Sequence, residues 1–321
     1  MQFFSKNLFI LKLILIYMAL NVSDIGEKEL INYILSKSND ITPDDTAITK
    51  FCDTNLISTC DMLIASKHFP SRMSYFQMGF KSVTVNVSDL AAMGADPLGF
   101  LLSIALPKDL EVEHFKEIID GVINACNYYN IPLIGGDTNE ASEIIISGTA
   151  LGLCDNPLLK NTANEGDFLC ITGDIGLAAL GFNLNEDNIY TDKSLKPLAR
   201  LKEGKIIKDA GATSATDITD GLVSELYEMK RDSLGFMIHE DKLEISDEFK
   251  EISSKLELDY LELILHVGED FELIFTVSDV DDLDIDFKVI GEVNNSNKIQ
   301  ITLSNGEIKE IDNRGYNHYV S

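Results

Sequence analysis

The sequence is poor in basic residues. Its 321 residues contain 26 lysines and arginines against 53 aspartates and glutamates, a formal net charge of −27. Nucleic acids and anionic membrane surfaces are bound through a positive face, which a chain of this charge is not expected to offer. We therefore expect no nucleic acid and no membrane as a partner, and we expect cations to mediate any binding of phosphate groups.

Cysteine is also scarce, and no C-x-x-C pair occurs. The five cysteines are Cys52, Cys60, Cys126, Cys154 and Cys170. An odd number of scattered cysteines favours reduced thiols, and it indicates neither a zinc site nor a disulfide framework. This pattern predicts a cytoplasmic location.

A hydrophobic run long enough to span a membrane is missing. The longest candidate, Leu8 to Leu20, has 13 residues and carries Lys12 in its middle, whereas a span needs about 20 residues. A signal peptide remains possible, although Lys12 and the lack of a small-x-small cleavage site argue against it. We predict that residues 1–20 are an apolar N-terminal extension, or that the start is assigned too early and Met18 is the initiator.

Two common nucleotide-binding motifs are absent. The chain contains no G-x-x-x-x-G-K-[ST] P-loop, and no kinase-type glycine loop followed by a strand lysine. A nucleotide would therefore have to be held chiefly through metal ions. In contrast, 45% of the residues are hydrophobic, which is sufficient for two domains that each have a core.

Both halves of the sequence show strands, long helices and a Gly-Asp element. In the first half we predict a helix from residue 25, a hairpin turning at 53–55, helices over 75–93 and 110–129, and strands over 98–106, 132–134 and 144–154. In the second half we predict strands over 168–172 and 273–277, and helices over 177–184, 198–209 and 222–230. The pattern indicates a mixed α/β (α+β) protein with domains over 21–155 and 156–321.

Acidic residues stand out along this pattern. Asp89 interrupts the small, apolar run from Asn86 to Pro97, where a desolvated carboxylate needs a partner or a cation. Helix capping is the alternative for any single residue of this kind. The same arrangement recurs beside Gly, Ser, Thr or Pro at Asp44, Asp45, Asp61, Asp137, Asp217, Asp220, Glu269 and Asp270.

As a set, these acidic residues favour a metal site. Junctions of strands and helices are where α/β proteins place ligands. Hard oxygen ligands without Cys or His clusters favour Mg²⁺, Mn²⁺ or Ca²⁺. In so acidic a protein, several divalent ions would have to neutralise bound phosphates, which is a physical argument for multi-metal phosphoryl transfer.

Six segments carry a resemblance to a known family. They are Thr59-Cys60-Asp61-Met62-Leu63 with His68-Phe69-Pro70, Asn86 to Pro97, Gly135-Gly136-Asp137-Thr138, Asp217-Ile218-Thr219-Asp220-Gly221-Leu222, Gly268-Glu269-Asp270-Phe271-Glu272-Leu273 and Gly315-Tyr316-Asn317-His318. In this order, from about residue 24 to 320, they resemble the thiamine-monophosphate kinases. That family is related to the aminoimidazole ribonucleotide synthetases and the selenophosphate synthetases.

The resemblance implies an ATP-dependent phosphorylation of thiamine monophosphate to thiamine diphosphate. It implies a Mg²⁺-assisted direct in-line transfer without a general base. It also implies a homodimer whose N-terminal domains pair into a shared β-barrel. Carried over by position, the Mg²⁺ ligands would be Asp45, Thr59, Asp61, Asp89, Asp137, Asp217 and Asp220. ATP would be contacted by Gly136, Asp137, Lys160 and Thr219, and thiamine monophosphate by His68, Glu269 and Tyr316.

The chain departs from the family pattern at several positions. Pro43 stands where the family has Gly before two aspartates, Cys60 replaces a usual Thr, and Lys160 replaces a usual Arg, which loses bidentate phosphate geometry. Thr219 and Val267 replace a usual Ser and a usual Gly. Two alternatives therefore stay open: another ATP-dependent enzyme of the selenophosphate or aminoimidazole ribonucleotide synthetase type, and a non-catalytic nucleotide- or metal-binding relative.

Overall fold

The computed structural model describes residues 21–37, 43–231, 233–281 and 283–314. The chain divides into two compact units, Pro43–Gly315 on one side and Met1–Thr42 with Tyr316–Ser321 on the other. The predictions for residues 1–20 and for Tyr316 lie outside the described residues. The domain bounds 21–155 and 156–321 stay a prediction.

In the smaller unit, the predicted N-terminal helix is present as α2 (Val22–Leu35). It begins three residues earlier than predicted, because the Asn21 backbone N–H donates to the Asp24 carboxylate at 2.7 Å and closes the first turn. Gly26 has a φ of 75° and introduces a kink. The sequence pattern from Ile25 therefore located the helix but not its true start.

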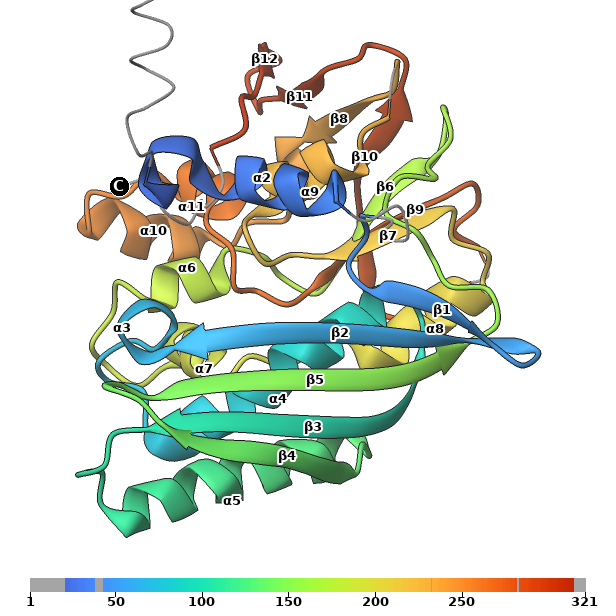
Figure 1. Cartoon of the computed structure of the whole chain (residues 1–321). Coiled ribbons are helices and arrows are strands. Elements are labelled where there is room, and N and C mark those ends of the chain that lie inside the picture. The colour runs from blue at the N-terminus through green and yellow to red at the C-terminus, as the bar shows by residue number, and fades with distance from the viewer. Residues whose placement is uncertain (1–20, 38–42, 232, 282, 315–321) are drawn as a thin grey trace, which may run out of the picture. The chain divides into compact units, whose positions relative to one another are not determined.

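The first sheet of the larger unit has five strands in the order β1-β2-β5-β3-β4. Their bounds are β1 Ala47–Phe51, β2 Thr54–Ile64, β3 Asp96–Leu106, β4 Leu133–Glu140 and β5 Ile145–Cys154. β3 and β4 are parallel, and the other neighbours are antiparallel. The sheet is open, with β1 and β4 at its edges (Figure 1). A closed barrel would need a second copy of the chain and stays a prediction.

The two long helices that the sequence predicted in this half are present. They are α4 (Tyr75–Ala92) and α5 (Val112–Tyr129). Ser74 and Gln77 form a capping box at the start of α4, which outweighs the strand-like alternation of the valines that follow. Gly121 permits close contact between the helices, since a Cβ there would lie 2.0 Å from the Phe76 carbonyl oxygen.

The second sheet has seven strands in the order β12-β11-β8-β10-β6-β9-β7. Their bounds are β6 Phe168–Thr172, β7 Ser214–Asp217, β8 Gly235–His239, β9 Leu273–Val277, β10 Phe287–Asn294, β11 Ile299–Thr302 and β12 Ile308–Glu310. The helices of this half are α6 Leu177–Gly181, α7 Ile189–Leu195, α8 Leu201–Asp209, α9 Leu222–Met229, α10 Asp247–Lys255 and α11 Tyr260–His266. Predicted strands β6 and β9 and helices α6, α8 and α9 are confirmed, with shorter helices than expected.

Helix α4 joins the two halves of the larger unit. Its last turn contacts β7 and α8, and Ala91 and Ala92 share a buried cluster with Ala215, Leu273 and Phe275. Small side chains here let α8 approach closely. Asp89 lies in this same turn, so the fold places that carboxylate where the two sheets come together.

Among the residues that the structure describes, none of the helices combines the length and the hydrophobicity that a membrane crossing requires.

Candidate functional site

Four of the predicted ligands converge from four separate elements. Asp89 comes from the last turn of α4, Asp61 from β2, Asp217 from the end of β7, and Asp45 from the loop before β1. After burial, repulsion from the other three carboxylates raises the pKa of Asp89. Asp61 lies inside β2, which continues to Ile64. Asp89 lies within α4, as the helix predicted over 75–93 implies, so it is not the cap of that helix.

These carboxylates are held in an environment that disfavours their charge. Burial, followed by repulsion from Asp217, Asp61 and Asp45, holds the pKa of Asp89 well above its ordinary value. Burial and repulsion from Asp45 raise the pKa of Asp217 to about 8. Burial raises the pKa of Asp45 to about 6, although Lys160 opposes the shift. The four carboxylates together therefore need more positive charge nearby than Lys160 supplies.

Neighbouring polar side chains supply only part of what the cluster needs. The Thr59 hydroxyl donates to Asp89 Oδ2, and the Thr216 hydroxyl donates to Asp45 Oδ1 at 3.0 Å. Lys160 Nζ lies 3.6 Å from Asp45 Oδ1. Burial alone would lower the pKa of Lys160, but the carboxylates, chiefly Asp45, outweigh it and raise the pKa. One ammonium cannot neutralise four carboxylates.

The composition of the cluster fits divalent cations. Asp45 Oδ2 and Asp217 Oδ2 are buried and have no hydrogen-bond partner, and a buried carboxylate oxygen without a donor is costly unless a cation binds it. Within the described ranges, no three His, Cys, Asp or Glu side chains form a group that could hold a metal ion alone. Water or substrate oxygens would complete the coordination, which is how Mg²⁺ is usually bound.

Asp220 and Thr219 follow β7 in the loop that opens α9. Both of their backbone N–H groups donate to Glu225 Oε1, at 3.0 Å from Asp220 and 3.3 Å from Thr219. Burial raises the pKa of Glu225 to about 8. The sequence analysis missed Glu225, although a carboxylate in the first turn of a helix is a recognisable capping signal.

Gly136 and Asp137 lie away from the cluster in this chain. The segment from Gly135 to Thr138 is part of the edge strand β4, where Asp137 is exposed and pairs with Ser103. Strands β3 and β5 separate β4 from β2. Asp137 therefore lies about 14 Å from β2, measured across the sheet. Gly136 is required by close packing, since a Cβ there would lie 1.7 Å from the Leu102 carbonyl oxygen.

The two described residues predicted for the thiamine end are brought together by a lysine. Lys81 of α4 donates to the His68 carbonyl oxygen at 3.0 Å and pairs with Glu269 Oε2. Lys81 is fully buried. The sequence analysis missed it, because a lysine inside an apolar helix carries no motif of its own.

The departures from the family pattern have local explanations. Asp44 accepts a hydrogen bond from the Asp45 backbone N–H at 3.0 Å, so the loop after Pro43 is fixed by a side chain. Cys60 is exposed and lies beside Ser147, with 3.6 Å between Sγ and Oγ. It alternates with Thr59 along β2 and therefore faces away from Asp89.

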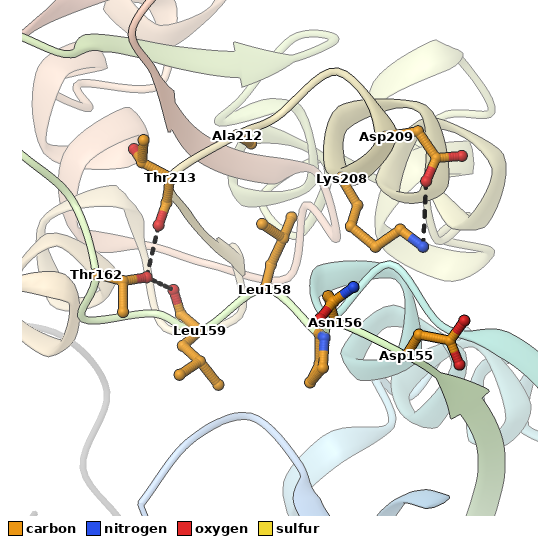
Figure 2. Close-up of a pocket in the computed structure, with 10 residues that line it drawn as sticks. Asp155, Asn156, Leu158, Leu159, Thr162, Lys208, Asp209, Ala212 and Thr213 are labelled. Carbon is orange, nitrogen blue, oxygen red and sulfur yellow. Dashed lines mark hydrogen bonds and ion pairs between the residues drawn. The ribbon is translucent and has the colours of Figure 1, made fainter. Parts of the chain in front are cut away.

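A cavity of about 590 Å³ lies apart from these residues (Figure 2). The segment from Asp155 to Thr162 lines it together with the end of α8, where Lys208 pairs with Asp209 at 3.2 Å. Of the predicted metal, ATP and thiamine residues that the structure describes, none lines this cavity.

Comparisons with known proteins agree with this arrangement. Residues 43–154 match the family model "AIR synthase related protein, N-terminal domain", and residues 164–304 match the corresponding C-terminal domain. The thiamine-monophosphate kinase of Pyrococcus abyssi is 39% identical over 283 residues, covering 86% of this chain and 89% of the relative. That of Pyrococcus horikoshii is 36% identical over 284 residues, covering 86% and 90%.

Solved structures extend the likeness to the whole fold. A structure of AaThiL complexed with AMPPCP and TMP superimposes with a TM-score of 0.84 at 29% identity, covering 94% of this chain and 99% of that one. The sequence relatives span most of the chain and carry one activity in their names. By this likeness and by its carboxylate cluster, the chain belongs to the thiamine-monophosphate kinase family.

Proposed function

We propose that this protein phosphorylates thiamine monophosphate to thiamine diphosphate, with ATP as the donor, by direct in-line transfer. The observation that carries this proposal is the convergence of Asp45, Asp61, Asp89 and Asp217 with buried, unpartnered oxygens. Such a cluster suits the binding of phosphates through metal ions. The names of the relatives point to thiamine monophosphate as the acceptor.

The residues that would hold Mg²⁺ are oxygen donors from both halves of the larger unit. We assign this role to Asp45, Thr59, Asp61, Asp89, Asp137, Asp217 and Asp220. When bound, the ions would neutralise the phosphates of donor and acceptor, which would otherwise repel each other. The buried carboxylates fix the position of that positive charge, because packing of α4, β2 and β7 leaves them little freedom.

The chain's own residues would orient the two substrates. Lys160 and Thr219 lie beside the cluster and would contact ATP together with Gly136 and Asp137. His68, Glu269 and Tyr316 would hold the thiamine end. The attacking phosphate oxygen is already anionic near pH 7. The protein therefore has to align the two substrates and does not have to remove a proton.

A second copy of the chain completes this proposal. Asp137 lies about 14 Å from the level of β2 in its own subunit, on the exposed edge strand β4. In a homodimer whose open sheets join edge to edge, Asp137 of one subunit would reach the cluster of the other. We propose this shared barrel as the reason for an acidic residue on an otherwise exposed strand.

A substrate comparison tests the function. The purified protein with ATP and Mg²⁺ is given thiamine monophosphate, the precursor of aminoimidazole ribonucleotide, or selenide, and the consumption of ATP is measured. We expect ATP consumption only with thiamine monophosphate, and thiamine diphosphate as the product. ATP consumption with either of the other two acceptors would favour a related ATP-dependent enzyme. No ATP consumption with any acceptor would favour a non-catalytic relative. A cytoplasmic location belongs to the same proposal, and the five unpaired cysteines agree with it.

A further inference from the structure

Lys81 is a buried cation that the proposed chemistry does not use. It lies on α4 with none of its surface exposed. Lysine is almost never fully buried unless it is paired, because removal of an ammonium from water is costly. Its position therefore needs a reason, and its partners supply one.

Both partners of Lys81 belong to segments assigned to the acceptor substrate. The ammonium donates to the His68 carbonyl oxygen at 3.0 Å, at the end of the short helix α3 (Ala65–His68). It also pairs with Glu269, whose side chain is 31% exposed. One lysine thus connects a segment of the first half to a loop of the second.

The Glu269 loop is held in an unusual conformation. Glu269 has a φ of 71° and Phe271 a φ of 53°, both in the left-handed region that most side chains avoid. The Glu269 backbone N–H donates to the Thr219 carbonyl oxygen at 2.9 Å. The loop therefore lies between the residues assigned to thiamine monophosphate and the Asp217–Asp220 segment. Lys81 holds the Glu269 side chain of this loop.

We propose that Lys81 is a positioning residue for the acceptor: it fixes the Glu269 carboxylate relative to His68 and so sets the affinity for the cationic thiamine moiety. This inference rests on the proposed function. Without the ammonium, the half-exposed Glu269 side chain is free to turn into solvent. Binding of ATP, which takes place at the carboxylate cluster, does not depend on this contact.

Lys81→Met tests the proposal, because methionine keeps the apolar stem and removes the charge. We expect the KM for thiamine monophosphate to rise about tenfold to a hundredfold, the range for loss of a charged hydrogen bond. The KM for ATP and the thermal midpoint should change little. The control is Lys116→Met on α5, whose lysine is exposed and pairs with Glu113, and which should leave all three values unchanged.

A double-mutant cycle identifies the partner through which Lys81 acts. Glu269→Gln alone should raise the KM for thiamine monophosphate, and adding Lys81→Met should raise it little further, since the contact is already broken. Independent, additive effects of the two substitutions would overturn the proposal. So would an equal rise in the KM for ATP, or a loss of stability with an unchanged KM.

Hydrogen exchange gives a readout that does not depend on catalysis. In Lys81→Met, amide exchange over residues 64–70 and 267–272 should become faster, while that of β3 stays as in the wild type. Unchanged exchange in both segments would overturn the proposal. A wild-type protein that fails to turn over thiamine monophosphate would contradict the proposed function instead. If Lys81→Met does not fold, Lys81→Gln is used instead, and the same rise in the KM for thiamine monophosphate is expected.

Discussion

At the scale of single residues, the site depends on carboxylates that are stable only with a counter-charge. Burial, and after it repulsion from neighbouring carboxylates, raises the pKa values of Asp89 and Asp217. Asp45 has Lys160 nearby, whereas Asp217 Oδ2 has no hydrogen-bond partner. These buried carboxylates thus weaken the fold when no cation neutralises them.

Substitution of Asp89 should separate these two effects. We expect Asp89→Asn to lower kcat/KM by a factor of about 100 or more, because a group that stabilises transferred charge is lost. Without Mg²⁺, its thermal midpoint should be equal to or above that of the wild type, since one repelling charge is gone. Asp120→Asn, an exposed position on α5, serves as the control. Near-normal turnover by Asp89→Asn would refute the metal-site assignment.

At the scale of elements, α4 determines the site. It carries Lys81 near its start and Asp89 near its end, and it packs against β2, β5, α5 and α8. Its sequence also shows what can be predicted. The capping box at Ser74 and the Gly94-x-x-Pro97 end signal a helix, although the alternation of Val83, Val85 and Val87 is that of a strand.

Disturbing the contact between α4 and α5 should affect stability but not chemistry. Gly121→Ala places a methyl group 2.0 Å from the Phe76 carbonyl oxygen, and the helices must separate. We expect the free energy of unfolding to fall by about 1–3 kcal/mol, as for other overpacked contacts, with kcat unchanged in the folded protein. Urea denaturation measures the first value. The matched control, Asn124→Ala on the exposed side of α5, should leave both unchanged.

The elements that the sequence did not predict have two causes. Strands β8 and β10 form through pairing with segments that are distant in the sequence, and β11 pairs with β8 in the same way. Strands β11 and β12 also form a local hairpin across Asn305-Gly306, a turn signal that the sequence analysis did not use. Likewise, Gly135 to Thr138 look like a turn but extend β4, because pairing with β3 overrides the glycines. The sequence singled out the carboxylates Asp61, Asp89 and Asp217, which the structure brings together. Glu225 was missed although its place in the first turn of α9 is a capping signal. Lys81 could not be singled out, since only tertiary contacts give it a role.

At the scale of the whole molecule, charge and symmetry govern the expected behaviour. The net charge of −27 adds to the repulsion inside the cluster, and cations relieve both. The exposed edge at β4 leaves one predicted ligand beyond the reach of its own subunit. Two predictions follow at this scale, one on pH and one on assembly.

Without divalent ions, stability should fall as the pH rises from about 4 to 8. The pKa values of Asp45, about 6, and Asp217, about 8, exceed the ordinary value of 3.8. The native state therefore keeps protons that the unfolded state has already released, and raising the pH favours unfolding. For Asp45 alone the effect is on the order of 3 kcal/mol. Adding Mg²⁺ should raise the thermal midpoint more at pH 8 than at pH 5, because cations bind the deprotonated form. An equal rise at both values would contradict the assignment.

Complementation between two inactive variants tests the shared site. Asp89→Asn and Asp137→Asn should each abolish turnover as homodimers. When the two are co-expressed, half of the dimers are mixed and each has one intact site, so about a quarter of wild-type activity should return. Differently tagged subunits confirm that mixed dimers form. Mixed dimers without activity would show that Asp137 acts within its own subunit.

The spacing of Lys81 and Asp89 on one helix has a consequence for substrate choice. Eight residues separate them, which corresponds to a rise of about 12 Å along α4. Under the proposed function, α4 would therefore fix the distance between the cationic end and the phosphate end of the acceptor, because a packed helix does not stretch. An acceptor in which these two groups are closer together, such as a shortened analogue of thiamine monophosphate, would satisfy one end only. Selectivity for length would then be a property of the backbone of α4 rather than of any side chain.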